Sequence, residues 1–186
     1  MKNNSSIMHT LNKPMDERIV NALNNILTDY MERHCKTFVM RLDVHFPKEM
    51  QQDGIVKFNH RFIEKEKNAG YDPVYAVARE LSANNNIHYH MALFLNGNKT
   101  ESIFYHIKNA EKVLENIVGK DAINEKTAWI ERCDKDHRNG ITLYRNNPNT
   151  YDLHEVQRQI SYLAKIEQKE NVKGKRYFTS KKRKKQ

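Results

Sequence analysis

Residues 87–95 read Ile-His-Tyr-His-Met-Ala-Leu-Phe-Leu, and this alternation constrains the fold more than any other stretch of the chain. Successive side chains of a β-strand point to opposite faces, so His88 and His90 share one face while Met91 and Leu93 lie on the other. Two imidazoles two positions apart on a stiff strand can bind one divalent cation. The chain has nine histidines, so such a pair arises by chance roughly a few tenths of the time, and the motif needs support from other residues.

Two neighbouring stretches offer a third metal ligand. Residues 74–81 read as a strand, and the turn residues that follow predict a hairpin that brings Glu80 close to the histidines. Apolar and polar residues also alternate in residues 37–46, which predicts a strand with Asp43 on its polar face. If this strand pairs with the histidine strand, Asp43 lies on the same surface as the histidines. A one-residue slip in the hairpin would turn Glu80 to the opposite face, so the sequence leaves Glu80 and Asp43 as alternatives. A solvated sheet face would also explain the polar alternation without any chemistry.

The order of predicted elements indicates the fold class. An apolar stripe at helical spacing predicts one helix that starts at Pro14. Trp129 and Cys133 are expected to be buried or half-buried in a strand near the end of the chain. Antiparallel strands with helices on one face form an α+β fold. We therefore expect a central antiparallel sheet of about five strands, with helices packed on one face and the metal site on the other. The remaining predicted helices span 58–69, 102–118 and 151–169, and the predicted strands span 37–46, 74–81, 87–95, 127–133 and 140–144.

A second motif lies in the last predicted helix, in the run Ser161-Tyr162-Leu163-Ala164-Lys165. Tyr162 and Lys165 are three residues apart and therefore share a face of the helix. A tyrosine at its reference pKa of about 10 is a poor nucleophile at neutral pH, and a neighbouring cation favours its charged form and helps to hold a phosphate. On its own, the pair is ordinary for a half-exposed helix. Together with the two histidines, it predicts a nucleophile near a metal.

The positive charge is concentrated at one end of the chain. The net charge is +9, and residues 173–186 hold eight basic residues and no acidic one, so the remaining residues are nearly neutral. Such a segment attracts phosphate backbones without reading sequence. Two cysteines do not form a disulfide framework, and no apolar stretch is long enough to cross a membrane, so we expect a soluble cytoplasmic protein without a membrane partner. We predict a disordered segment at 1–13, one domain at 14–172 and a basic tail at 173–186.

Taken together, the two motifs resemble those of the HUH endonucleases, the single-strand nicking enzymes of rolling-circle replication, in their single-tyrosine form. Arg79-Glu80, the run from His88 to Asn96, Ser161-Tyr162-Leu163-Ala164-Lys165 and Arg176-Tyr177-Phe178-Thr179-Ser180 are similar to segments of the replication initiators of filamentous phages and their prophage relatives. The resemblance implies a ferredoxin-like or RRM-like nuclease palm. It further implies His88 and His90 as metal ligands, Glu80 as the third ligand with Asp43 as the alternative, Tyr162 as nucleophile and Lys165 as its helper. The DNA-binding residues that we expect are Arg41, Arg79, Lys173, Lys175, Arg176, Lys181, Lys182 and Arg183.

The resemblance implies an activity as well. We expect Mn²⁺- or Mg²⁺-dependent nicking and rejoining of single-stranded DNA or of an origin hairpin, through a 5′-phosphotyrosine, in the replication of a phage, phage satellite or plasmid. The sequence has no ATP-binding Gly-x-x-x-x-Gly-Lys-Ser/Thr pattern, so a separate helicase and the host replication machinery would be partners. The alternatives are a single-tyrosine transposase, a hydrolytic metalloenzyme without a covalent step, and an origin-binding module that does not cut.

Overall fold

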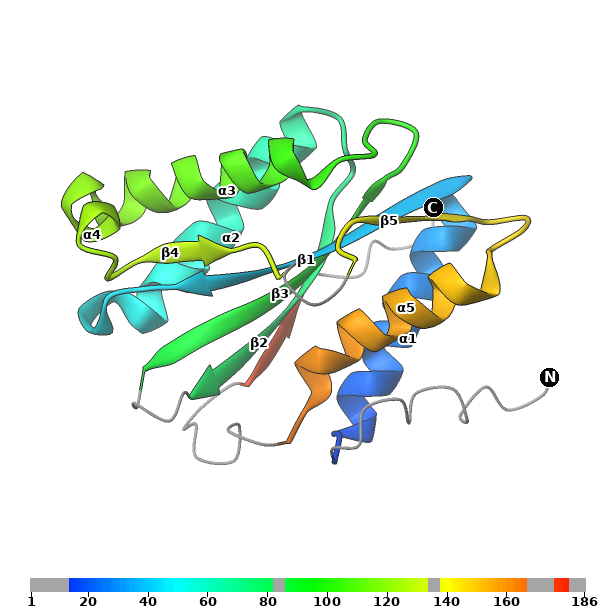
Figure 1. Ribbon diagram of the computed structural model, residues 1–186, viewed down its shortest axis with the longest axis horizontal. Helices are drawn as coiled ribbons and strands as arrows, with labels where there is room; N and C mark the ends of the chain where they lie inside the picture. Colours follow the sequence, from blue (N-terminus) through cyan, green and yellow to red (C-terminus); the bar gives the residue numbers. More distant parts are fainter. Residues whose placement is uncertain (1–13, 82–85, 134–137, 167–175, 181–186) are drawn as a thin grey trace.

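The computed structural model describes residues 14–81, 86–133, 138–166 and 176–180. Within these residues the chain forms an α+β fold around one antiparallel sheet of six strands (Figure 1). The strand order is β4-β1-β3-β2-β6, and β5 also pairs with β1. The strands are β1 (Lys36–His45), β2 (Val74–Leu81), β3 (Ile87–Asn96), β4 (Trp129–Glu131), β5 (Ile141–Tyr144) and β6 (Tyr177–Thr179). The helices are α1 (Glu17–Arg33), α2 (Gln51–Asn68), α3 (Ile103–Val118), α4 (Lys120–Asn124) and α5 (Thr150–Ser161), with short 3₁₀ turns η1 (Lys48–Met50) and η2 (Tyr162–Ala164).

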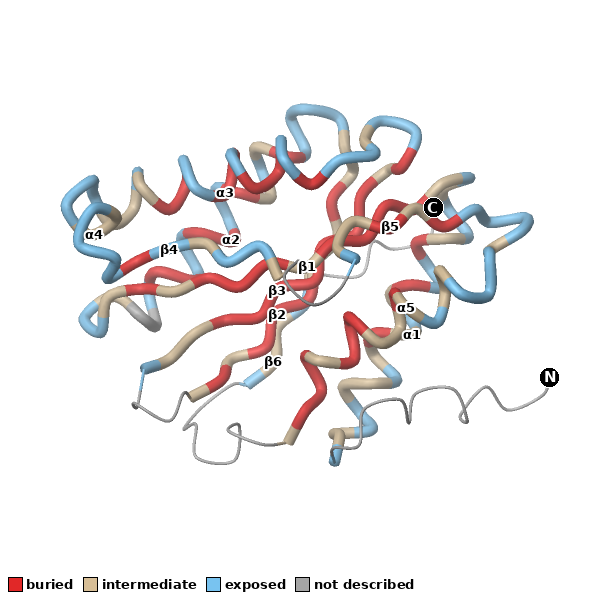
Figure 2. The backbone as a smooth tube through the Cα atoms, viewed as in Figure 1, coloured by how far each residue is buried: buried red, intermediate tan, exposed pale blue. Residues whose placement is uncertain are grey.

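Helix α2, between β1 and β2, and helix α3, which follows β3, lie together on one face of the sheet (Figure 1). The alternation in β1 and β3 explains this, because on this face both strands carry large apolar residues that are buried, and Figure 2 shows the middle of each strand buried along most of its length. This arrangement of β1, α2, β2, β3, α3 and β4 is the ferredoxin-like palm that the sequence predicted. Its core contains Phe38, Met40, Leu42 and Val44 of β1, Tyr89, Met91, Leu93 and Leu95 of β3, and Phe58, Phe62, Ile107 and Leu114 of the helices.

The opposite face, which we call the site face, carries a second helical layer over part of its area. Helices α1 and α5 pack there on small and apolar residues of the strands, including Val39, Ala92 and Phe94. The sequence-based prediction had left this face free of helices. The apolar stripes of α1 and α5 must be buried against another element. The other face of the sheet is already covered by α2 and α3, so α1 and α5 pack on the site face. The residues of the predicted metal site lie on the same face, farther along the strands.

Most element boundaries agree with the sequence-based prediction, and the differences have physical reasons. Helix α2 begins seven residues earlier than predicted, at Gln51, because its first turn is polar and shows no apolar stripe. This turn contains Gly54, where a Cβ atom would lie 2.6 Å from Cδ1 of Phe46, so the helix packs closely on that ring. Helix α1 begins at Glu17 rather than at Pro14, because the side chain of Asp16 accepts a hydrogen bond from the backbone N–H of Arg18 and caps the helix.

The sheet extends into the segment that the sequence assigned to the basic tail. Strand β6 pairs with β2 in the register Val77 to Phe178, and Phe178 packs against the core on the α2–α3 side. Three residues among lysines give too short an alternation to predict a strand. The predicted disordered segment 1–13 lies outside the described residues. None of the described helices has the length and hydropathy that a membrane span requires.

Candidate active site

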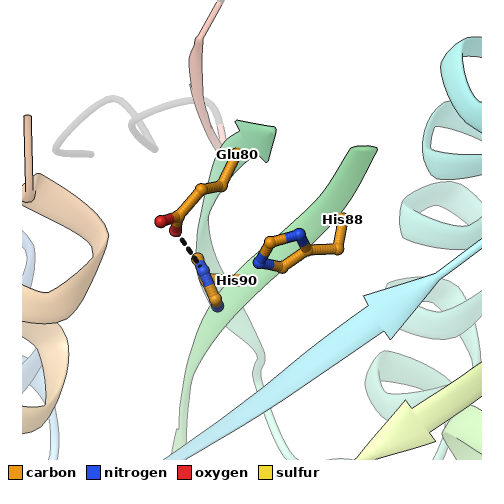
Figure 3. A group of neighbouring side chains, drawn as sticks. All are labelled: Glu80, His88 and His90. Carbon is orange, nitrogen blue, oxygen red and sulfur yellow. Dashed lines mark hydrogen bonds and ion pairs between the residues drawn. The ribbon is translucent and has the colours of Figure 1, made fainter. Parts of the chain in front are cut away.

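The pairing of three strands brings the predicted metal ligands together on the site face. In the β2–β3 hairpin, Glu80 lies directly opposite His88, and in the β1–β3 pair, Asp43 lies opposite His90. Residues that face each other across antiparallel strands point to the same side of the sheet. The register that the sequence left open is therefore resolved, and Glu80 shares the face of the two histidines (Figure 3).

Glu80, His88 and His90 form a group that could hold a metal ion. Each offers one ligand atom, and these atoms all lie within 4.8 Å of one another. Glu80 and His90 are 4% and 3% exposed, while His88 is half-buried. Two imidazoles and one carboxylate are a common donor set for divalent metals and leave further positions open for water or substrate. The donor set and its depth in the protein thus fit the predicted cofactor class.

His90 lies between the carboxylates of Glu80 and Asp43, and its contacts with them show which of the two is placed as the third ligand. Its Nε2 atom contacts Oε2 of Glu80, whereas its Nδ1 atom lies 2.8 Å from Oδ2 of Asp43. A metal-bound histidine uses one ring nitrogen for the ion and donates the N–H of the other to an acceptor. Nε2 of His90 faces Glu80, so Glu80 belongs to the group that could hold the metal. Asp43 contacts the other ring nitrogen, Nδ1, and is placed to orient the His90 ring.

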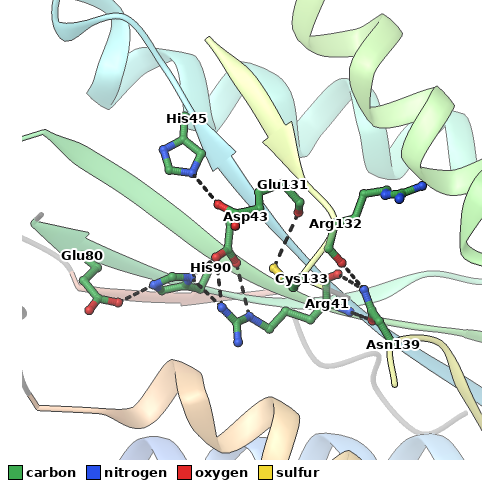
Figure 4. Close-up of polar contacts among 9 residues, drawn as sticks. All are labelled: Arg41, Asp43, His45, Glu80, His90, Glu131, Arg132, Cys133 and Asn139. Atoms are coloured by element: carbon green, nitrogen blue, oxygen red, sulfur yellow. Dashed lines mark hydrogen bonds and ion pairs between the residues drawn. The ribbon is translucent and has the colours of Figure 1, made fainter. Parts of the chain in front are cut away.

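The neighbours of the buried Asp43 carboxylate, His90 and Arg41, keep it charged. Asp43 is only 5% exposed, and such burial by itself raises the pKa of a carboxyl group. The neighbouring His90 and the Arg41 guanidinium outweigh burial and hold the pKa of Asp43 well below its usual range. Arg41 pairs with both carboxylate oxygens, with Nη2 at 3.0 Å from Oδ2 and Nε at 3.3 Å from Oδ1 (Figure 4).

Tyr162 lies beside this group, at the point where α5 ends. Its ring centroid is 5.1 Å from that of His90, in an edge-to-face arrangement. Two cations contact the same tyrosine ring, since Cζ of Arg41 lies 3.9 Å and Nζ of Lys165 lies 3.1 Å from its centroid. The sequence placed both residues of the Tyr-x-x-Lys motif inside an α-helix that ran to Lys169. That placement is wrong, because α5 ends at Ser161 and Tyr162 begins the 3₁₀ turn η2.

The turn that carries Tyr162 is held by the residues that precede α1. The backbone N–H of Asp16 donates to the carbonyl of Ala164 at 2.8 Å, and the N–H of Ile166 donates to the carbonyl of Pro14 at 3.1 Å. These two bonds form an antiparallel bridge between Met15 and Lys165, which we call the N-terminal bridge. It replaces the backbone bonds that a continued helix would have made.

A row of stacked rings continues from the metal group to the edge of the sheet. His45 stacks on His88 with ring centroids 5.2 Å apart, and Trp129 stacks on His45 at 3.9 Å. Burial and the neighbouring His88 lower the pKa of His45 to about 4, so its ring is neutral at pH 7. Trp129 is 43% exposed, so the expectation that it is buried or half-buried in the core is wrong: it lies on an edge strand with its ring on the site face.

The chain between β4 and β5 contributes a polar support that the sequence did not indicate. The two strands pair with opposite ends of β1, and the Asn139 amide fills the gap between them. Its Oδ1 accepts from the backbone N–H of Arg41 at 2.9 Å, and its Nδ2 donates to the carbonyl of the same residue at 2.7 Å (Figure 4). Nearby Cys133 is half-buried, as predicted, and burial together with the Asp43 carboxylate raises the pKa of its thiol.

The residues predicted to bind DNA have different positions. Arg41 lies within the site, in contact with Asp43 and Tyr162. Arg79 follows the alternation of β2 to the opposite face from Glu80, next to Tyr89 and the α2–α3 core, so it is not part of the site. Arg176 directly precedes β6 and is exposed. The other predicted DNA-binding residues, Lys173, Lys175, Lys181, Lys182 and Arg183, lie outside the described residues.

Comparisons with known proteins give one family. No match was found among curated proteins or among solved structures. A family model described as the YagK/YfjJ C-terminal domain matches residues 1–180. Because this match spans almost the whole sequence, the chain belongs to the YagK/YfjJ C-terminal domain family.

Proposed function

We propose that this protein is a metal-dependent endonuclease that nicks and rejoins single-stranded DNA through a covalent bond to Tyr162. The observation that carries the proposal is the position of the tyrosine ring, 5.1 Å from the ring of His90 within the group Glu80, His88 and His90. A structural tyrosine needs no metal-binding group beside it, and a hydrolytic metal site needs no tyrosine. Their juxtaposition supports nucleophilic attack at a phosphate that is held by both.

Glu80, His88 and His90 would hold Mn²⁺ or Mg²⁺, with Asp43 orienting His90. When bound, the ion supplies positive charge to a non-bridging oxygen of the scissile phosphate. Imidazole ligands suit Mn²⁺ better than Mg²⁺, so we expect stronger activity with Mn²⁺ in vitro. Beyond the ligands, Arg41 and Lys165 add two positive charges where negative charge gathers during the reaction.

The chemical step is a transesterification at phosphorus. The phenolic oxygen of Tyr162 forms a bond to the phosphorus atom and loses its proton, and the bond from phosphorus to the 3′ oxygen breaks, so this oxygen takes up a proton and leaves as a 3′-hydroxyl. The 5′ end stays attached as a phosphotyrosine. No phosphodiester energy is lost, so attack by a 3′-hydroxyl on the phosphotyrosine reverses the step and rejoins a strand. The released 3′ end can also prime DNA synthesis.

In the cell, this activity would serve the start of rolling-circle replication of a phage, phage satellite or plasmid. The protein would act in the cytoplasm at a single-stranded or hairpin origin. A separate helicase would unwind the duplex ahead of the host polymerase.

The test is to detect the covalent product. Labelled single-stranded DNA carrying an origin sequence from the element that encodes the protein is incubated with Mn²⁺ and separated under denaturing conditions. The wild-type protein should yield a labelled band at the mass of protein plus DNA, and Tyr162→Phe should yield none. The matched control is Tyr177→Phe, because Tyr177 also packs on the helices of the site face but lies on β6. An adduct that persists in Tyr162→Phe, or no adduct with any strand of the element, would reject the proposal.

A further inference from the structure

The tryptophan at the edge of the sheet is an exposed aromatic ring next to the candidate metal group. Trp129 is the only tryptophan of the chain. It lies on β4 opposite His45 of β1, so its side chain points to the site face. An indole is large and apolar, and exposing 43% of this residue leaves apolar surface in water.

The ring does not point freely into solvent but ends an ordered stack. The planes of Trp129 and His45 differ by 9°, and those of His45 and His88 differ by 8°. Three nearly parallel rings therefore lead from a candidate metal ligand to the surface. The stack holds the indole in one orientation, so a flat ligand that binds to it loses little extra side-chain entropy in the protein.

We propose that Trp129 is the stacking platform for a nucleobase of the bound single-stranded DNA, at a position adjacent to the phosphate at the metal group. This inference rests on the proposed function and adds a substrate subsite to it. A nucleobase has the flat π-surface that matches a fixed indole, and every base has it, so the platform adds affinity without selecting sequence. The sugar-phosphate chain then runs from the stacked base toward Glu80, His88 and Tyr162.

A second exposed aromatic residue gives a matched comparison. Tyr144 is 49% exposed and lies on β5, which pairs with the same strand β1 but at its opposite end, where it faces Lys36. The two positions are nine residues apart along β1, which corresponds to about 30 Å. Tyr144 is therefore an aromatic residue of similar exposure on an equivalent edge strand, remote from the site.

The experiment uses the intrinsic tryptophan fluorescence of the protein. Because Trp129 is the only tryptophan, a change in this emission is assigned to that residue. The full-length protein is titrated with a short oligo(dT) strand without divalent metal, so that no cleavage occurs, while the anisotropy of a dye on the DNA reports binding independently. We expect binding to quench the tryptophan emission. Trp129→Ala should weaken binding about 5- to 150-fold, Trp129→Phe should retain most of the affinity, and Tyr144→Ala should bind like the wild type.

The outcomes distinguish this inference from the proposed function. If the wild type binds DNA without quenching, or if Trp129→Ala binds within twofold of the wild type, the stacking platform is rejected while the nicking proposal stands. Equal losses in Trp129→Ala and Tyr144→Ala would also reject it, because the effect would not be specific to the site. If the wild type binds no single-stranded DNA, the proposed function itself fails. Circular dichroism of each variant confirms that the affinity changes occur in folded protein.

Discussion

Asp43 and Glu80 contact the two different nitrogens of one imidazole ring, that of His90. Oδ2 of Asp43 lies 2.8 Å from Nδ1, and Glu80 contacts Nε2. With a metal ion bound, donation of Nδ1–H to Asp43 would leave Nε2, on the side of Glu80 and His88, to bind the ion. The carboxylate of Asp43 is thus placed to orient His90 without belonging to the group that could hold the metal.

Asp43→Asn is expected to weaken the binding of Mn²⁺ by about 10- to 100-fold, the usual effect of removing a partner that orients a metal ligand. Asparagine keeps the shape of the side chain but not its charge, so His90 loses its anionic acceptor. Isothermal titration calorimetry measures the affinity. Glu131→Gln is the control, because Glu131 pairs with Asp43 across β1 and β4 but lies outside the metal group. Equal affinities of Asp43→Asn and the wild type would remove Asp43 from this role.

Arg41→Lys is expected to slow formation of the covalent adduct by about 10- to 100-fold while leaving Mn²⁺ affinity within a few-fold of the wild type. Lysine keeps the charge but cannot contact both oxygens of Asp43 and at the same time lie over the Tyr162 ring, so the proposed nucleophile loses a contact that fixes its position. Single-turnover kinetics with excess protein measure this step. Arg79→Lys, on the opposite face of the sheet, should react at the wild-type rate. A wild-type rate in Arg41→Lys would show that the guanidinium does not position Tyr162.

Deleting residues 1–15 is expected to reduce adduct formation because it removes the Pro14 carbonyl and so breaks half of the N-terminal bridge. The deletion of residues 1–13 keeps both backbone bonds of the bridge and is the matched control. Metal affinity should be the same in the two proteins, since the metal group lies on β2 and β3. If both truncated proteins form the adduct at the same rate, the bridge is not needed to hold Tyr162.

Gly140→Ala is expected to lower the free energy of unfolding by about 2 to 4 kcal/mol, from overpacking and from a positive φ. Gly140 has φ +80°, and an added Cβ would lie 2.5 Å from Cγ2 of Ile103 and 2.8 Å from Cζ of Phe38. Gly70→Ala separates the two effects, because Gly70 has φ +84° but no atom within 4 Å of an added Cβ. Gly70→Ala should lower the free energy of unfolding by about 1 to 2 kcal/mol. Urea denaturation measures both, and equal losses would mean that the Phe38 and Ile103 contacts relax freely.

The sheet except for β6 was predictable from sequence because alternation is a local signal. The predicted strand from Val74 to Leu81 has the limits of β2, and the face shared by His88 and His90 follows directly from a period of two. The side on which Glu80 lies was not predictable, because it depends on the register of the hairpin and hence on the geometry of the turn.

The contacts around Tyr162 could not be read from the sequence for a different reason. Arg41 and Tyr162 are far apart along the chain and meet only because α5 docks on the site face. No local pattern encodes that docking or the end of α5 at Ser161, since the apolar spacing continues past it. The amide of Asn139 supports the backbone of Arg41 through another contact between residues that are far apart in sequence.

The candidate site is divided between the sheet and the α1–α5 helical layer. All three possible metal ligands belong to the sheet, whereas Tyr162 is attached to the layer formed by α1 and α5, which is held to the sheet by a separate apolar cluster. A partly folded chain whose α1–α5 layer has come away from the sheet would keep the three possible metal ligands together but would no longer hold Tyr162 beside them. Under the proposed function, covalent attack on DNA would therefore require both the folded sheet and the docked α1–α5 layer.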